Sequence, residues 1–394
     1  MKKTGANSTI ILIVAWLAYT SVYIGRLNLS VASPMMEMAG VINKDQIGYL
    51  SSLFFFVYAI GRIFNGYIGD KVEPKFILGV GLMLSALSNL GMGFMLPVSF
   101  MFVIWGINGY AQSTMWGPAM RVVTEAYEDP KKRTRAAMIL STSIGAGGII
   151  GIAAATAVSG FGAAAVFFVP GCIMLIISAM VLLVLPRTKR SVEVQQLSPF
   201  KLALNKDILK IVFPALAHGA IKDNLNLWMV TYFVESYNTD VSASAPFVFM
   251  IPTATLIGRM VYPLLYRLCK YSDKWSVVIS FVICAASLVP IIFFKLPMAL
   301  CCLLLCFTAL SVSMINVAFL AIYPLRFQAT NNVSMASGLI DFVTYMGSAI
   351  GSFVFGIVIS AFGFNIMYII WIVISAVSAL IMLFNKKPRP LVVD

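Results

Sequence analysis

The chain has 394 residues, of which 60% are hydrophobic and only 11% are charged, with a mean hydropathy of +0.93. Soluble domains are about 25% charged, so this composition excludes a soluble globular protein. The formal net charge of +13 does not indicate a nucleic-acid partner, because no run of basic residues is interleaved with aromatic residues as such a surface requires.

Apolar stretches recur along the whole chain, each close to the ~20 residues that a helix needs to cross the hydrocarbon core. They are built from Leu, Ile, Met, Phe, Ala and Gly without a two-residue alternation, which predicts helices and not the strands of a barrel. The first stretch is too long for a signal peptide and lacks a small-residue cleavage site, so we expect it to be a span. The twelve predicted spans cover residues 9–36, 47–69, 76–97, 100–124, 136–160, 164–186, 208–236, 244–268, 275–294, 297–323, 333–361 and 365–384.

The longest polar connection, residues 187–207, lies between the sixth and seventh spans. It predicts an N-terminal six-helix bundle over 1–186, a cytoplasmic linker over 187–207, and a C-terminal six-helix bundle over 208–394. Twenty Lys and Arg residues lie in the segments on the side of both termini, and only Lys44 and Lys295 lie in the loops on the other side. By the positive-inside rule, both termini are expected in the cytoplasm. The membrane is expected to be the cell (inner) membrane.

The two predicted bundles carry similar motifs. Arg26-Leu-Asn-Leu in the first span matches Lys222-Asp-Asn-Leu in the seventh, 196 residues later. Ile-Gly-Arg62 in the second span recurs as Ile-Gly-Arg259 in the eighth, 197 residues later. Both the fifth and the eleventh spans are rich in glycine. The agreement predicts an all-α membrane fold of two parallel, pseudo-symmetric repeats with a substrate site near the midplane between them.

Apart from Lys210 and Arg267 at span ends, five basic residues fall inside predicted spans: Arg26, Arg62, Arg121, Lys222 and Arg259. A lone intramembrane cation costs about 2.5–3.5 kcal/mol on insertion scales, so each is expected to face a cavity or a partner. The first-span arginine and the seventh-span lysine lie deepest and occupy equivalent helices, which predicts an anion site. The arginines of spans four and eight lie towards the cytoplasm and are interpreted as gate or packing residues. Arg62 is interpreted as either a second cation of the site or a gate residue.

Further polar and aromatic residues share helix faces with these cations and are candidate substrate contacts or charge partners. They are Tyr19 and Tyr23 beside Arg26, Tyr58 one turn before Arg62, Asn108 and Gln112 in span four, His218 four residues before Lys222, and Asp341 and Tyr345 in span eleven. The histidine is either a hydrogen-bonded structural residue or a proton carrier. The aspartate is expected either to pair with Lys222 or to carry a proton.

The segment Gly66-Tyr-Ile-Gly-Asp70-Lys71-Val-Glu-Pro-Lys75 joins an acid at a helix end to basic residues. Its spacing resembles the cytoplasmic signature of the major facilitator superfamily, in which the acid latches neighbouring helices, so Asp70 and Lys71 are predicted gate residues. The alternative is an ordinary helix-ending turn. The second-half copy, from Gly258 to Lys270, has no acid at the matching position, which predicts an asymmetric latch.

Further motifs point to one family within that superfamily. Four segments resemble the organophosphate:phosphate antiporter family, which includes bacterial glycerol-3-phosphate and hexose-phosphate transporters. They are the run from Arg26 to Met36, the segment from Tyr58 to Asp70, the fourth-span motif from Trp105 to Arg121, and Tyr345-Met-Gly347. The resemblance implies that Arg26 and Lys222 bind the phosphate, that Tyr58 and Arg62 support it, and that Trp228 follows as in the family. This chain departs from the family by having lysine for the second arginine, no histidine in span five, and Leu227 before the tryptophan.

We therefore expect a secondary active transporter that exchanges glycerol phosphate or a sugar phosphate for inorganic phosphate by rocker-switch alternating access. The alternatives are a proton-coupled symporter of an organic or sugar acid, and a transporter-like sensor of such anions. An enzyme is not expected, since no nucleophile–base pair, nucleotide loop or metal motif appears. We expect a monomer with no cofactor, metal or nucleic acid, whose partners are a small anionic substrate and the lipid bilayer.

Overall fold

The computed structural model describes residues 8–187, 202–330 and 333–384, apart from the side chains of residues 66–71, 130, 134, 245, 328–330, 333 and 334. Residues 188–201 of the predicted linker lie outside this part of the chain. Contacts divide the chain into two compact units, Met1–Val192 with Met229–Ala245 and Glu193–Trp228 with Pro246–Asp394. Each unit is described by itself.

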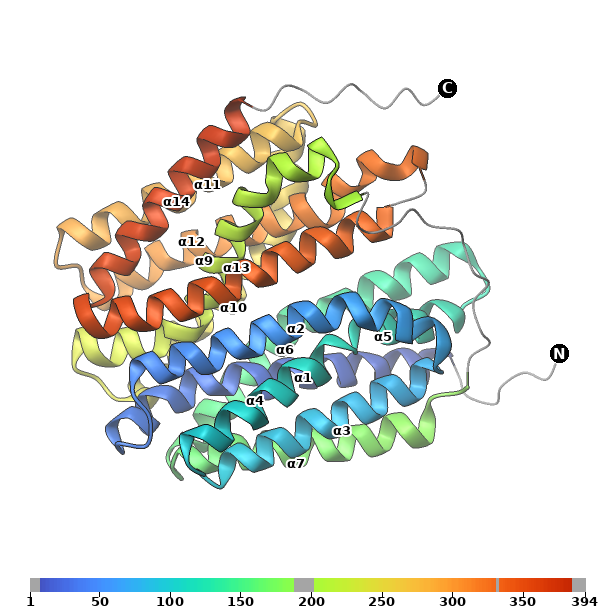
Figure 1. Cartoon of the computed structure of the whole chain (residues 1–394), viewed down its shortest axis with the longest axis horizontal. Coiled ribbons are helices and arrows are strands. Elements are labelled where there is room, and N and C mark those ends of the chain that lie inside the picture. Colours follow the sequence, from blue (N-terminus) through green and yellow to red (C-terminus); the bar gives the residue numbers. More distant parts are fainter. Residues whose placement is uncertain (1–7, 188–201, 331–332, 385–394) are drawn as a thin grey trace. The chain divides into compact units, whose positions relative to one another are not determined.

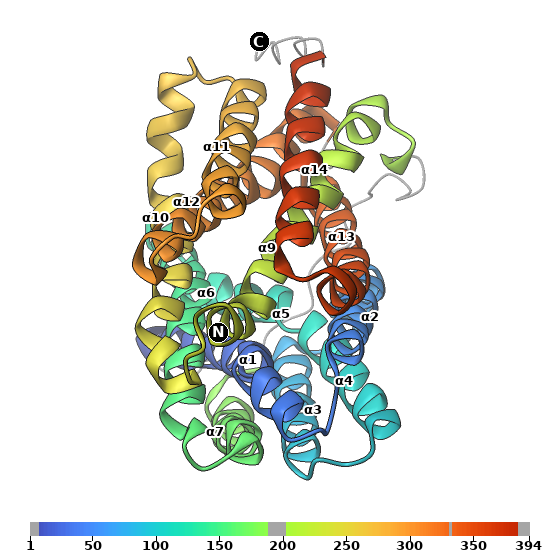
Figure 2. The ribbon, with the colours of Figure 1, turned by 90° about the vertical axis from the view of Figure 1, so that its left-hand side faces the viewer.

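Seven helices form most of the first unit. They are α1 (Ser8–Met38), α2 (Lys44–Lys71), α3 (Pro74–Gly93), α4 (Val98–Ser113), α5 (Trp116–Glu125), α6 (Pro130–Ser159) and α7 (Ala163–Val184). Helix α1 packs against α6 and α7, and α3 lies beside α7 along its length, as Figures 1 and 2 show. Proline at the first helical position starts both α3 and α6, where its missing N–H has no helical partner to lose.

The second unit begins with the first part of α9 (Lys206–Tyr237), whose last residues belong to the first unit together with the start of α10 (Val241–Leu268). It continues with α11 (Asp273–Phe293), α12 (Met298–Val317), the π-helical turn η1 (Ala318–Ile322), the 3-10 segment η2 (Tyr323–Thr330), α13 (Val333–Phe362) and α14 (Phe364–Phe384). Helix α11 packs between α12 and α14, which Figures 1 and 2 show beside it.

Ten helices in the described part of the chain are long and apolar enough to cross a membrane. The other two predicted spans are helical but differ from a continuous apolar helix. The fourth is broken into α4 and α5 next to Pro118, which has no N–H to continue the backbone ladder. The seventh is α9, which carries the polar run Lys222-Asp-Asn224 in its middle.

The predicted repeat is confirmed by the helix boundaries. Helices α2 and α10 are both 28 residues long and begin 197 residues apart, at Lys44 and Val241. Helices α6 and α13 are both 30 residues long and begin 203 residues apart, at Pro130 and Val333. Each unit also has its own apolar core, so each repeat buries its own side chains.

Glycines bring helices into backbone contact in each unit, and one such contact in each involves a predicted anion-binding helix. In the first, a Cβ on Gly147 of α6 would lie 2.8 Å from the carbonyl oxygen of Thr20 on α1. In the second, a Cβ on Gly347 of α13 would overlap the carbonyl of Leu216 on α9. Thr20 and Leu216 are 196 residues apart, and the two glycines are 200 apart. Small residues let membrane helices approach this closely, and both predicted anion-binding helices, α1 and α9, are held in this way.

Candidate functional site

Arg26 lies inside the first unit with aromatic rings around its guanidinium. The side chain is 8% exposed. Its guanidinium carbon is 4.8 Å from the ring centroid of Tyr58, 5.2 Å from that of Tyr23 and 5.4 Å from that of Phe54. Cations over ring faces are stabilised by the ring quadrupole, more strongly where water is excluded. We call Arg26 and its contacts the Arg26 cluster.

Neutral amides from α4 orient this arginine. Arg26 Nε donates to Gln112 Oε1 at 2.8 Å, and Gln112 Nε2 donates to Asn108 Oδ1 at 3.1 Å and to the Gly25 carbonyl at 3.3 Å. Asn108 Nδ2 and Asn89 Nδ2 each donate to the same carbonyl at 3.1 Å. Buried polar groups must be hydrogen-bonded, so this network fixes the position of the cation. Of the two predicted polar residues of span four, Gln112 therefore bonds to Arg26 directly, and Asn108 holds Gln112 in place.

Tyr19 and Arg62 extend the same cluster. The Tyr19 ring is 4.7 Å from that of Trp116 and 6.0 Å from that of Tyr23, between ring centroids. The Arg62 guanidinium carbon lies 5.8 Å from the Tyr58 ring centroid, so this ring is shared by two arginines. The predicted site residues of the first half are thus brought together.

The second unit places Lys222 beside an acid and one aromatic ring. Lys222 Nζ is 3.3 Å from Asp223 Oδ2 and 4.6 Å from the Tyr345 ring centroid. Ser348 of α13 donates to the same oxygen, Asp223 Oδ2, at 2.5 Å. The side chains of Lys222 and Asp223 are 19% and 13% exposed. We call these four residues the Lys222 cluster.

Asp223 was not among the residues predicted from the sequence. Consecutive helical residues do not face one another, so spacing alone pointed to the face that holds His218 and Asn226 and not to the next residue. The acid proposed for Lys222 was Asp341, which is buried on α13, and its pairing with Lys222 stays a prediction.

Three other predicted residues have separate surroundings. His218 is fully buried, with Nε2 3.3 Å from Asn316 Nδ2 and with no hydrogen-bond partner for Nδ1 among the described residues. Trp228 is fully buried and its Nε1 has no hydrogen-bond partner among the described residues. Arg259 is half-buried on α10. Roles for these residues in substrate binding, coupling or gating stay predictions.

The predicted gate of the first half is described in part. Arg121 Nε donates to Glu125 Oε1 at 2.7 Å within α5, as the four-residue spacing indicates. The side chains of Asp70 and Lys71, the other predicted gate residues of this half, lie outside the described residues.

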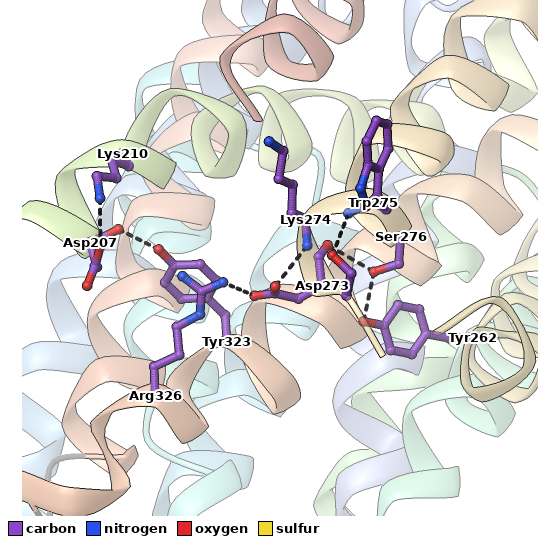
Figure 3. A network of polar contacts seen from close by, with 10 residues as sticks. Asp207, Lys210, Tyr262, Asp273, Lys274, Trp275, Ser276, Tyr323 and Arg326 are labelled. Atoms are coloured by element: carbon purple, nitrogen blue, oxygen red, sulfur yellow. Dashed lines mark hydrogen bonds and ion pairs between the residues drawn. The ribbon is translucent and has the colours of Figure 1, made fainter. Parts of the chain in front are cut away.

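The second half contains an acid–base cluster that the sequence interpretation missed (Figure 3). Asp273, in the first turn of α11, forms an ion pair with Arg326 of η2. The Arg326 guanidinium carbon lies 4.0 Å from the ring centroid of Tyr323, whose hydroxyl donates to the Asp207 carbonyl at 2.6 Å. This acid lies three residues beyond Lys270, where the second-half copy of the signature segment ends. An acid in the first turn of a helix is the signal that points to it.

Together, the long apolar helices and the two repeats define a multi-pass helical membrane protein. Comparison with known proteins agrees with this class. Residues 15–328 match the family described as Major Facilitator Superfamily. The chain therefore belongs to the Major Facilitator Superfamily, and its fold is that of this superfamily.

Individual relatives are distant. The chain is 25% identical to a phosphoglycerate transporter protein of Salmonella typhimurium, over 89% of this chain and 83% of that protein. It is 26% identical to a probable hexose phosphate transport protein of Chlamydia trachomatis, over 47% of this chain and 41% of that protein. A crystal structure of the nucleoside transporter NupG superposes with a TM-score of 0.79 at 17% identity, covering 96% of this chain and 99% of that one.

Proposed function

We propose that the protein is a secondary active transporter that exchanges a phosphorylated organic metabolite, such as glycerol phosphate or a sugar phosphate, for inorganic phosphate. The observation that carries the proposal is one cation at the same position of each repeat, Arg26 in α1 and Lys222 in α9. A planar guanidinium presents parallel N–H donors to two phosphate oxygens, and an ammonium adds a point charge. Tyr23, Tyr58 and Tyr345 lie on these cations and supply hydroxyl donors and ring faces.

In this proposal Arg26 and Lys222 each contribute a positive charge to phosphate binding, and transport proceeds by alternating access. The names of the two relatives support a phosphate ester as the class of substrate, because both are described as transporters of such esters. The excess of twenty basic loop residues over two supports cytoplasmic termini in an inner membrane.

Transport by purified protein in liposomes tests the proposal. Liposomes loaded with inorganic phosphate should accumulate labelled glycerol 3-phosphate, and empty liposomes should not. The same assay is run with a labelled sugar acid and with a pH gradient in place of internal phosphate. Uptake that does not depend on internal phosphate and is lost when the pH gradient is removed would support the proton symporter instead. Thermal stabilisation by the ester with no flux under either gradient would support the sensor.

A further inference from the structure

The acid of the Lys222 cluster belongs to the second repeat only. The position equivalent to Asp223, 196 residues earlier, is Leu27, beside Arg26. The first repeat therefore has an apolar residue where the second has a carboxylate 3.3 Å from its cation. A ligand that reaches Lys222 meets a cation and an acid together.

The structure holds this carboxylate in one orientation. Ser348, which is fully buried, donates to Oδ2 at 2.5 Å and also contacts the carbonyls of Gly219 and Thr344 at 3.1 and 3.2 Å. A Cβ on Gly219 would overlap the Thr344 carbonyl, so the two helices carrying the acid and the serine are in backbone contact. The acid cannot swing away from Lys222 without breaking this bond.

Both described contacts of the carboxylate fall on the same oxygen. Lys222 Nζ and Ser348 Oγ approach Oδ2, and the hydrogen bonds and ion pairs found within the described ranges leave Oδ1 unused. The Asp223 side chain is 13% exposed and therefore reachable. An oriented carboxylate oxygen of this kind accepts a hydrogen bond from a hydroxyl and repels a second anion.

We propose that Asp223 determines substrate specificity by accepting a hydrogen bond from a hydroxyl of the organic part of the substrate and by rejecting a second anionic group there. The inference rests on the proposed function. Phosphate esters whose organic part offers a hydroxyl to Asp223 therefore bind more tightly than esters that present a carboxylate there. Discrimination by an unfavourable contact with the wrong ligand is as effective as a favourable one with the right ligand.

Asp223→Asn tests the proposal, because it removes the charge and keeps the size and an oxygen acceptor for Ser348. The probes are glycerol 3-phosphate and 3-phosphoglycerate, which differ by a hydroxymethyl group and a carboxylate, with inorganic phosphate as the reference ligand. Affinities are measured by thermal stabilisation of the full chain in detergent. The wild type should prefer glycerol 3-phosphate, and Asp223→Asn should shift the ratio of affinities by at least about tenfold towards 3-phosphoglycerate. Glu128→Gln, the same charge change on an exposed acid, should leave the ratio unchanged.

The outcomes separate the two proposals. An unchanged ratio in Asp223→Asn, with inorganic phosphate still bound, overturns the specificity role and leaves the proposed function standing. A wild type that neither phosphate nor either ester stabilises overturns the proposed function and the inference with it. If Asp223→Asn cannot be purified, Ser348→Ala keeps the ion pair but releases Oδ2, and the preference should fall by about threefold. An unchanged preference in that variant also overturns the inference.

Discussion

The Arg26 and Lys222 clusters occupy equivalent positions of two repeats but are built from different chemistry. Amides from α4 and three aromatic rings position the arginine. A neighbouring carboxylate and one ring position the lysine. The first arrangement suits the arginine, because the plane of its guanidinium must be fixed. The second suits the lysine, because its ammonium is a point charge that a counter-ion partly neutralises.

The helix packing behind the two clusters differs much less. Gly147 lies on Thr20 in one repeat as Gly347 lies on Leu216 in the other. The comparison teaches that the close helix contacts are common to the repeats, whereas the polar side chains they present have diverged. Specificity is therefore to be sought in the residues that differ between the clusters.

The largest expected effect comes from removing either cation. Arg26→Ala and Lys222→Ala each take away one charge from the proposed phosphate site while the other groups stay in place. Truncating one partner of a desolvated charge pair costs about 2–5 kcal/mol, so phosphate affinity should fall by at least about 30-fold. Equilibrium binding of labelled phosphate measures this. Wild-type affinity in either variant, with a normal unfolding temperature, would rule out the two-cation site.

The conservative exchanges at these positions sharpen the comparison. Arg26→Lys loses the Nε bond to Gln112 and should bind phosphate poorly, whereas Lys222→Arg keeps the charge and should be tolerated. Equal losses from the two exchanges would mean that both clusters depend on geometry to the same degree.

Sequence patterns predicted the spans, the repeat and most of the Arg26 cluster, because helical spacing places residues three and four apart on one face. They did not predict that Asn89 of α3 would share the Gly25 carbonyl with Asn108, since contacts between distant spans have no local signal. They also missed Asp223, because its pairing with the preceding residue depends on side chains reaching around the helix. The break in the fourth span was missed although Pro118 signals it.

The next largest effect is expected from a substitution at the glycine contact between α9 and α13, and it concerns the stability of the fold. Gly347→Ala would drive a Cβ into the Leu216 carbonyl, and overpacking of this kind costs about 1–3 kcal/mol. The unfolding temperature in detergent should fall by several degrees, at about 2–4 °C per kcal/mol for a unit of this size. Gly147→Ala, whose Cβ would lie 2.8 Å from Thr20 O, should cost less.

Gly338→Ala is the matched control on the same helix, because no atom of another described element lies within 4 Å of its Cβ position. It should be neutral or slightly stabilising, since alanine favours helix over glycine by up to about 1 kcal/mol. If Gly338→Ala and Gly347→Ala lower the unfolding temperature equally, close backbone contact at Gly347 is not what makes alanine costly there.

The amide network of the Arg26 cluster should matter less than the cation itself. Gln112→Leu removes the acceptor for Arg26 Nε and leaves the amide of Asn108 without one of its partners. An unsatisfied buried polar group costs about 1–3 kcal/mol, part of which should appear as weaker phosphate binding. Thermal unfolding and phosphate affinity are measured together. Ser348→Ala is the counterpart in the Lys222 cluster and should leave phosphate affinity closer to wild type, because Lys222 retains Asp223.

The smallest effect separates the Arg121–Glu125 pair of the first half from the Asp273–Arg326 pair of the second. Arg121 and Glu125 lie one turn apart on α5, and Glu125 is 36% exposed, so Glu125→Gln should cost about 0.3–0.5 kcal/mol. Asp273 and Arg326 join α11 to η2 and are 14% and 18% exposed. Asp273→Asn keeps a hydrogen-bond acceptor but loses the charge that favours the first turn of α11, so about 1 kcal/mol is expected. High salt should widen the difference from Glu125→Gln, because the exposed Arg121–Glu125 pair is screened more than the Asp273–Arg326 pair. If both substitutions cost the same and salt abolishes both effects, the pair at α11 is an ordinary surface contact and the second half has no latch of its own.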